Sequence, residues 1–246
     1  MPQVSDNTGY FGIARWQAWA PGVADADAWR RWLPEGESPQ ADAQPDVSYL
    51  PGLMRRRLDR SGRMALSTAW PCAEGLVSLP CVFASRHGVL ARSLELLTNL
   101  ARDEVLSPTS FSLSVHNSNL GLLSIARGDR AAATAIGAGP DSLGMGLLEG
   151  ANLIAEGADQ VLVCYADDKV PAPYLPLVEE DASHRPFAVS LLLTQPEDPA
   201  GRCRLSPSDA PPDEVPEAAL MRWLLDIADS AIVGVDQPWR LERVHG

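Results

Sequence analysis

The sequence has little basic charge. Its 246 residues include 20 lysines and arginines against 32 aspartates and glutamates, which gives a formal net charge of −12. Proteins that bind nucleic acid normally carry a basic face, so we expect no nucleic-acid partner. Apolar residues make up 46% of the chain and charged residues 21%. This is ordinary globular composition, and it predicts a packed core.

Cysteine and histidine are also scarce, with four of each. No C-x-x-C pair occurs, and no histidine lies at metal-ligand spacing from a cysteine, so we expect no metal site. Cys81 and Cys164 lie inside apolar runs, where reduced cysteines usually serve as packing residues.

Long apolar runs are missing as well, since none approaches the ~20 residues that a membrane span needs. The first ten residues carry neither the basic nor the apolar region of a signal peptide. We therefore expect a cytoplasmic protein with no membrane span.

What the sequence does contain is an alternation of strand-like and helix-like segments. Apolar runs predict strands at residues 10–20, 79–85, 131–136, 160–167 and 187–194. Apolar residues at helical spacing predict helices at residues 53–69, 89–102, 118–127, 142–156 and 217–227. This order predicts the α/β class, with a mixed, mostly parallel sheet of about five strands flanked by helices.

Two proline-rich stretches interrupt the alternation. Residues 21–51 are acidic and rich in proline, which predicts an irregular excursion on the surface. Residues 196–216 are typical of a polar linker before the last predicted helix. We expect one domain over residues 1–246, with the excursion at 21–51 and the linker plus a C-terminal helix at 196–246.

A glycine turn, Gly137-Ala-Gly-Pro-Asp-Ser142, follows a predicted strand and opens a predicted helix. This setting is typical of a dinucleotide-binding loop, with Asp159 or Asp167 as the acidic residue downstream. The third glycine of that loop is missing, and Pro140 lacks the N–H that a phosphate would need. A nucleotide-binding oxidoreductase subunit and a plain tight turn are both open alternatives.

A hydrolase that uses Ser142 or Asp141 with His116 is a further alternative. The sequence contains no G-x-S-x-G motif, the usual setting of a nucleophilic serine in an α/β-hydrolase. One sequence also does not tell whether these three groups meet in space.

The predicted helix after the turn contains three glycines. Each costs about 1 kcal/mol relative to alanine inside a helix, so we expect a neighbouring element to approach the helix backbone closely. The three are Gly144, Gly146 and Gly150. The helix is therefore expected to be buried at the centre of the fold.

Between Ser107 and Asp168, a series of spaced residues follows an order that is typical of one family. The series is Phe111, Asn117, Gly121, Ser124-Ile125, Gly128, Thr134-Ala135, Ser142, Gly144, Leu153-Ile154, Gly157-Ala158-Asp159 and Val161. It resembles the N-terminal half of a β-ketoacyl synthase of the thiolase-like superfamily. The resemblance implies a thiolase-like half-fold, in which a small-residue strand runs into a turn with a nucleophilic cysteine and a buried helix follows.

The chain departs from that family at the nucleophile. Counting forward from Gly128 places the family's cysteine at Gly137, and counting back from the helix places it at Pro140. Neither these residues nor Ala138 and Gly139 between them can form an acyl-enzyme. The family's two catalytic histidines and its lysine lie in a second half-domain, and this chain has about half the length needed for both. The resemblance therefore implies no catalysis by this chain alone, and it implies no cofactor.

A ketosynthase half without its nucleophile is similar to the chain length factors of type II polyketide synthases. Short versions of such subunits accompany ketosynthases in bacterial aryl polyene pathways. The resemblance thus implies a subunit of a β-ketoacyl synthase (acyltransferase) complex, which forms a heterodimer with an active ketosynthase and shapes its acyl tunnel. It implies contact with an acyl carrier protein only through that complex. The alternative is a standalone small enzyme that uses the turn at residues 137–142.

The same resemblance assigns two sets of residues. A strand that pairs antiparallel with its counterpart in the ketosynthase is implied at Asp129, Arg130, Ala131, Ala132, Ala133, Thr134 and Ala135. Residues that reach the partner's acyl tunnel are implied at Phe111, Leu113, Val115 and His116. Bulk at these last positions would limit the length of the product.

One basic stretch interrupts the acidic chain. Five arginines, Arg55, Arg56, Arg57, Arg60 and Arg63, lie within the helix predicted at residues 53–69. They form either a solvated basic face or a docking patch for an acidic partner. The sequence leaves open whether the carrier protein contacts this patch.

Overall fold

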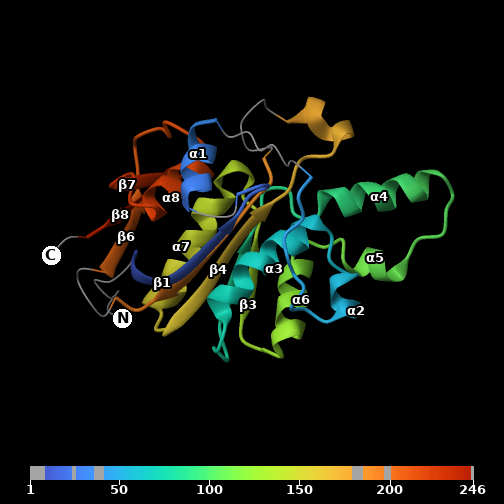
Figure 1. Ribbon diagram of the computed structural model, residues 1–246, viewed down its shortest axis with the longest axis horizontal. Coiled ribbons are helices and arrows are strands. Elements are labelled where there is room, and N and C mark those ends of the chain that lie inside the picture. The colour runs from blue at the N-terminus through green and yellow to red at the C-terminus, as the bar shows by residue number, and fades with distance from the viewer. Residues whose placement is uncertain (1–8, 24–25, 36–41, 179–184, 197–200, 245–246) are drawn as a thin grey trace, which may run out of the picture.

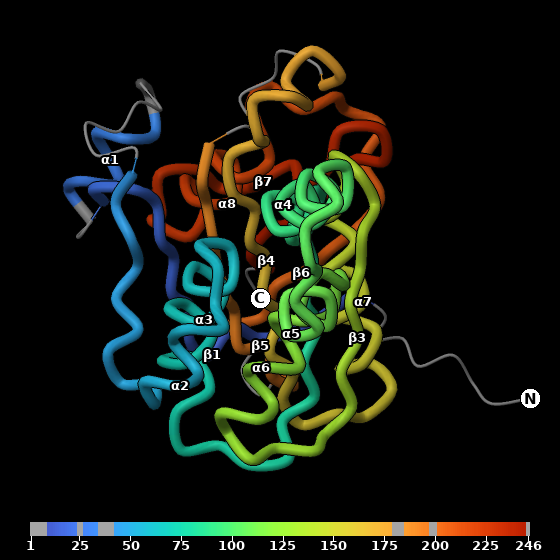
Figure 2. Tube along the Cα trace, turned by 90° about the vertical axis from the view of Figure 1, so that its right-hand side faces the viewer, coloured from blue at the N-terminus to red at the C-terminus, as the bar shows by residue number. Residues whose placement is uncertain are grey.

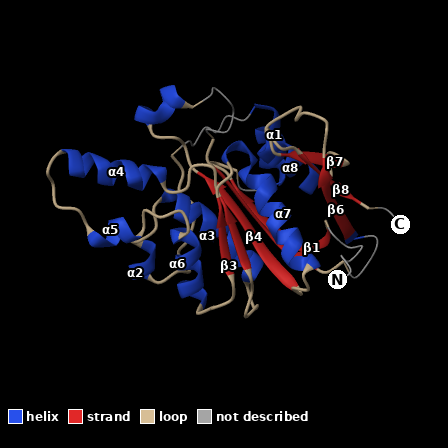
Figure 3. Ribbon diagram, turned by 180° about the vertical axis from the view of Figure 1, so that it is seen from behind, coloured by secondary structure: helices blue, strands red, loops and turns tan. Residues whose placement is uncertain are grey.

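Within the residues that the computed structural model describes, the chain forms an eight-stranded mixed sheet with helices on both faces (Figures 1 and 3). These residues are 9–23, 26–35, 42–178, 185–196 and 201–244. The strands are β1 (Tyr10–Trp19), β2 (Cys81–Ala84), β3 (Ala133–Ile136), β4 (Gln160–Asp167), β5 (Phe187–Thr194), β6 (Arg202–Pro207), β7 (Ser230–Val233) and β8 (Trp239–Arg243). Their order in the sheet is β3-β2-β4-β5-β1-β6-β8-β7. The predicted α/β class is confirmed.

The number and direction of the strands correct the prediction. Eight strands are described instead of about five, and the parallel pairs are β2–β3 and β2–β4. The other five pairs are antiparallel, so the prediction of a mostly parallel sheet is wrong. The stretch expected to be a linker and a C-terminal helix, residues 196–246, supplies β6, β7 and β8 as well as the helix. These short strands alternate buried and more exposed residues and lack the continuous apolar run that marks β4 and β5.

The helices are α1 (Ala26–Glu35), α2 (Gly52–Arg55), α3 (Arg60–Ala73), α4 (Leu90–Ala101), α5 (Pro108–Ser112), α6 (Ser118–Arg127), α7 (Ser142–Ala155) and α8 (Pro216–Leu224). Two short 3-10 helices, η1 (Gly139–Asp141) and η2 (Ala172–Leu177), complete the described part. No helix in this described part is long and apolar enough to cross a membrane.

Two helix predictions need correction. The excursion at residues 21–51 is not wholly irregular, because α1 forms within it and packs Trp29 and Trp32 into the core. The helix predicted at residues 53–69 is broken into α2 and α3. The break lies at Asp59, whose carboxylate accepts a 2.8 Å hydrogen bond from the N–H of Gly62 and so begins α3 as its N-cap.

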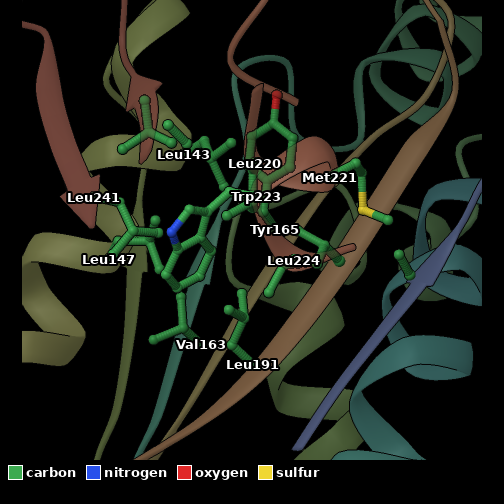
Figure 4. Close-up of a cluster of buried hydrophobic side chains, with 14 of the residues drawn as sticks. Leu143, Leu147, Val163, Tyr165, Leu191, Leu220, Met221, Trp223, Leu224 and Leu241 are labelled. Carbon is green, nitrogen blue, oxygen red and sulfur yellow. The ribbon is translucent and has the colours of Figure 1, made fainter. Parts of the chain in front are cut away.

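Each face of the sheet buries its own hydrophobic core. In β4, Val163 and Tyr165 belong to the core covered by α1, α7 and α8, whereas Leu162 and Cys164 belong to the core covered by α3 and α6. This alternation with a period of two is that of a strand covered on both faces. Figure 4 shows the first core, in which Trp223 of α8 packs among side chains of the sheet and of α7.

The glycines of α7 permit the close approach that the sequence predicts. A Cβ on Gly144 would lie 2.5 Å from the carbonyl oxygen of Val233, at the end of β7. A Cβ on Gly146 would lie 2.7 Å from the Cβ of Ala84 in β2, and one on Gly150 would meet side chains of β4 and β5. Glycine at these positions therefore lets α7 lie directly against the sheet and the end of β7.

Candidate functional site

The turn before α7 closes on itself. β3 ends at Ile136, Gly139 takes a left-handed φ of +57°, and η1 leads into the helix. The hydroxyl of Ser142 accepts a 3.0 Å hydrogen bond from the N–H of Ala138 and donates a 2.7 Å hydrogen bond to the carbonyl of Gly139. Because Ser142 is fully buried, its hydroxyl serves this turn and is not exposed to a substrate.

The C-terminal part of the chain is hydrogen-bonded to the end of this turn. Oδ1 of Asp141 accepts hydrogen bonds from three successive backbone N–H groups, those of Val235 (2.6 Å), Asp236 (3.0 Å) and Gln237 (3.2 Å). These residues form the connection between β7 and β8, and Asp141 is 6% exposed. Hydrogen bonds to a charged acceptor are among the stronger ones in proteins, so this Asp141 clamp holds the connection against the start of α7.

The structure does not combine Ser142, Asp141 and His116 into a catalytic group. Nε2 of His116 lies 3.1 Å from the carbonyl oxygen of Ser85, whereas the other two side chains are bound as described above. No hydrogen bond among the described residues joins any two of the three. The hydrolase alternative therefore loses its geometric basis, and the dinucleotide alternative loses the open helix start that a phosphate would need.

The thiols are not activated either. All four cysteines are free, and three of them are buried. Burial raises the pKa of Cys72 and of Cys81 to about 12, and it raises the pKa of Cys164 and of Cys203 to about 11. A thiol with such a pKa is protonated at neutral pH, whereas nucleophilic attack requires the thiolate. The cysteines are therefore packing residues, as the apolar runs around them predict.

The sheet has an open edge at β3. This strand lies at the end of the strand order and pairs on one side with β2. The N–H groups of Cys81 and Ser85 bind the carbonyls of Ala132 and Ile136, so alternate residues of β3 direct their main-chain groups toward β2. The main-chain groups of the residues between them point the other way, and no described strand pairs with them.

The strand at this edge is shorter than predicted, because residues 129–132 precede β3. Asp129 accepts hydrogen bonds from the N–H groups of Leu79 (3.0 Å) and Ala131 (2.9 Å) and forms a 3.3 Å ion pair with Arg127. Burial acts to raise the pKa of Asp129, but the two N–H groups and Arg127 outweigh it and lower that pKa. Asp129 thus fixes the start of β3 from within the protein.

A groove of about 620 Å³ runs between β3 and α6. Its walls carry mostly small or polar residues, namely His116, Asn117, Leu120, Gly121, Ser124, Ala133, Ala135 and Gly137. The small side chains allow another backbone to approach the groove closely. The groove and the open edge of β3 together form a surface that can accept a further chain segment.

An arm formed by α4, α5 and the residues up to 116 extends away from the sheet beside this groove, and it faces the viewer in Figure 2. α4 has only Leu96 buried. The arm surface, as we call its exposed apolar side chains, comprises Leu97, Leu100, Val105, Phe111 and Val115. Leu113 is half-buried against the core under α3 and α6, and His116 is half-buried. Several exposed apolar side chains on one projecting segment indicate an interaction site.

The predicted basic face is divided by the break between α2 and α3. Arg60 forms a 3.3 Å ion pair with Asp168, and Arg63 donates a hydrogen bond to the carbonyl of Arg55. Arg56 and Arg57 remain exposed and make no ion pair with any described residue. The basic surface available to a partner is therefore centred on these two arginines.

Residues 29–223 match the model of the β-ketoacyl synthase N-terminal domain. A solved structure of a ketosynthase (ApeO) in complex with its chain length factor (ApeC) from Xenorhabdus doucetiae contains a chain 30% identical to this one. The TM-score is 0.78, and the match covers 95% of this chain and 99% of that chain. The search of curated proteins finds no match.

Two further structures share the fold at lower identity. The ishigamide ketosynthase/chain length factor is 15% identical with a TM-score of 0.62, covering 81% of this chain and 67% of that one. Ketosynthase twelve of the bacillaene polyketide synthase from Bacillus amyloliquefaciens is 16% identical with a TM-score of 0.55, covering 85% of this chain and 46% of that one. The predicted thiolase-like fold is confirmed by the likeness to the Xenorhabdus doucetiae structure.

Proposed function

The chain belongs to the β-ketoacyl synthase family, and we propose that it is the non-catalytic chain length factor of a ketosynthase heterodimer that makes polyketides of the aryl polyene type. In this role it is a subunit of a cytoplasmic acyltransferase complex and has no condensing activity alone. Residues 1–246 act as one ketosynthase-like domain. The likeness at 30% identity to a chain of a ketosynthase and chain length factor complex, over nearly the whole of both chains, supports this assignment.

One observation carries the non-catalytic part of the proposal. The turn at residues 137–140, where the family's nucleophile is expected, contains no thiol, and the Asp141 clamp directly after it binds the start of α7 to the connection between β7 and β8. Elsewhere in the chain, burial raises the pKa of each cysteine to about 11 or 12. The chain therefore offers no thiolate for an acyl group at neutral pH.

The open edge of β3 is the surface that we assign to the ketosynthase. Ala133 and Ala135 direct their main-chain N–H and C=O groups away from β2, so a partner strand can continue the sheet there. Their small side chains permit close contact at the groove beside α6. Residues 129–132 lead into this strand and complete the interface.

Residues 111–116 of the arm are assigned to the partner's acyl tunnel. Phe111 is 66% exposed and Val115 is 50% exposed, and both lie on a projecting arm instead of in a core. Large apolar side chains are costly to leave in water, so a partner that covers them gains about 0.8 kcal/mol for each buried methylene. We assign Phe111, Leu113, Val115 and His116 to the wall that limits chain length. Limiting the chain length in this way requires no cofactor or metal from the chain.

Copurification tests the interface. Co-expression with its ketosynthase should give a stable complex, and Ala135→Pro should reduce copurification at least tenfold, because proline removes an outward N–H without removing one that faces β2. Thr134→Ala, which changes a side chain and leaves the main chain intact, is the matched control. Circular dichroism of both variants should match the parent. A well-folded Ala135→Pro variant that copurifies fully would overturn the assignment of this edge.

A further inference from the structure

Three loops of the protein meet at Ser85, which follows β2. The carboxylate of Asp167, at the end of β4, accepts hydrogen bonds from the Ser85 hydroxyl (2.7 Å) and from the N–H groups of Arg86 (2.7 Å) and His87 (2.9 Å). The Ser85 hydroxyl accepts a 2.7 Å hydrogen bond from the N–H of Gly88. Ser85 is fully buried and Asp167 is 3% exposed, so the turn at residues 85–88 is firmly attached to the sheet.

His116 is attached to this turn from the other side. Its Nε2 lies 3.1 Å from the carbonyl oxygen of Ser85, and its ring centroid lies 5.8 Å from that of Phe83. Because a backbone carbonyl only accepts hydrogen bonds, Nε2 must carry the proton that is donated. The imidazole thus donates a hydrogen bond to a rigid acceptor.

Two glycines make room for the His116 ring. A Cβ on Gly88 would lie 3.0 Å from Cδ2 of His116, and a Cβ on Gly137 would lie 3.4 Å from its Nε2. The turns after β2 and after β3 therefore approach the same edge of the imidazole. A side chain at residue 88 would crowd the ring, so glycine there leaves the space that the imidazole occupies.

Through this hydrogen bond, His116 connects the arm to the turn after β2. His116 follows Val115 directly and lies five residues after Phe111, and both of these side chains are exposed. We infer that His116 is a positioning residue, whose hydrogen bond to the Ser85 carbonyl fixes the placement of Phe111 and Val115 and so narrows the range of product lengths. This inference rests on the proposed function, because it specifies how His116, one of the residues assigned to the length-limiting wall, acts there: it holds Phe111 and Val115 in place.

Hydrogen exchange of the full-length chain tests the positioning itself. A glutamine side chain places its amide nitrogen near the position of Nε2, whereas an asparagine side chain is too short to reach it. In His116→Asn the amides of residues 111–116 should exchange about tenfold faster than in the parent, since a partly buried hydrogen bond is lost. In His116→Gln they should exchange within about twofold of the parent. Equal exchange in the parent and His116→Asn would overturn the inference.

Product analysis of the co-expressed complex tests the consequence. His116→Asn should broaden the distribution of product lengths, and His116→Gln should restore the parental distribution, which a residue needed only for folding would not do. Phe111→Ala, made in parallel, tests the proposed function separately. If Phe111→Ala changes the product length while His116→Asn leaves the distribution unchanged, the positioning role is wrong and the proposed function stands. If neither variant changes it, length control by this arm is wrong and the inference falls with it.

Discussion

The turn before α7 and the edge at β3 are neighbours in sequence and opposites in structure. In the turn, Ser142 and Asp141 are bound to the protein's own backbone and hardly exposed. Along the edge, Ala133 and Ala135 direct main-chain groups away from the sheet, beside a groove and an arm with exposed apolar side chains. The polar groups at the start of α7 are bound within the protein, whereas the outward main-chain groups of β3 are not paired with any described strand. This difference is the reason why we propose that the chain acts through its edge.

The largest effect on stability is expected from removing the Asp141 carboxylate. Asp141→Ala removes one acceptor from three backbone N–H groups, and the free energy of unfolding should fall by about 3 kcal/mol. Asp141→Asn keeps a carbonyl oxygen as acceptor and should cost about 1 kcal/mol. Urea unfolding of the isolated chain measures both values. A loss below about 0.5 kcal/mol in Asp141→Ala would mean that the clamp does not stabilise the turn.

A smaller effect is expected at the start of the open edge. The lowered pKa of Asp129 means that the folded protein binds fewer protons there than the unfolded chain does. Its contribution to stability is therefore present above the unfolded pKa and is lost as the pH falls through the folded pKa, below about pH 4. Asp129→Asn should lower the free energy of unfolding at neutral pH by about 1–2 kcal/mol and flatten its acid dependence. An unchanged acid dependence in this variant would assign the effect to other carboxyl groups.

The exposed Arg56 and Arg57 provide a test of a second surface of the molecule. If Arg56 and Arg57 meet an acidic carrier protein in the complex, Arg56→Glu/Arg57→Glu should weaken carrier binding about fivefold, or ~1 kcal/mol, and less at high salt. Arg30→Glu/Arg31→Glu, on α1 at the other face of the sheet, is the control with the same change in net charge. Titrations of the complex with carrier protein measure the affinities. Equal weakening by the control would indicate an effect of net charge and no defined patch.

The smallest expected effect is none at all. The isolated chain, incubated with malonyl or acyl thioesters, should show no covalent adduct by intact mass, since the pKa of each thiol is about 11 or 12. Reaction of these thiols with an alkylating reagent should accelerate only at strongly alkaline pH. A stoichiometric adduct at neutral pH would reveal a nucleophile that we do not expect in this chain.

The sequence predicts the centre of this fold better than its periphery. β4 and β5 are continuous apolar runs, and the glycines of α7 indicate the close approach of neighbouring strands, so both features could be expected. The sequence did not predict β6, β7 and β8. These strands are short, lack a continuous apolar run and lie in a proline-rich part of the chain, so their pattern is weak. The break at Asp59 depends on one cap, which the apolar periodicity of residues 53–69 conceals.

The Asp141 clamp and the Ser85–Asp167 contact could not be predicted from the sequence. The Asp141 clamp joins residues that are 94–96 positions apart, and the Ser85–Asp167 contact joins residues 82 positions apart. No local pattern marks such pairs, since the partners are far apart in the sequence and most of the donors are backbone N–H groups. The missing thiol, in contrast, was visible once the order of residues between Ser107 and Asp168 suggested where it should be.

Product length in the co-expressed complex tests the central claim most directly. Phe111→Ala removes several carbon atoms from the arm surface, and each methylene accommodated there is worth about 0.8 kcal/mol, so the balance between extension and release should shift severalfold toward longer products. Ile227→Ala, an equally simple truncation of an exposed apolar residue after α8, should leave the product length unchanged. Longer products from Phe111→Ala alone would support length control by the open side of the molecule. Identical products from both variants and the parent, in intact complexes, would contradict it.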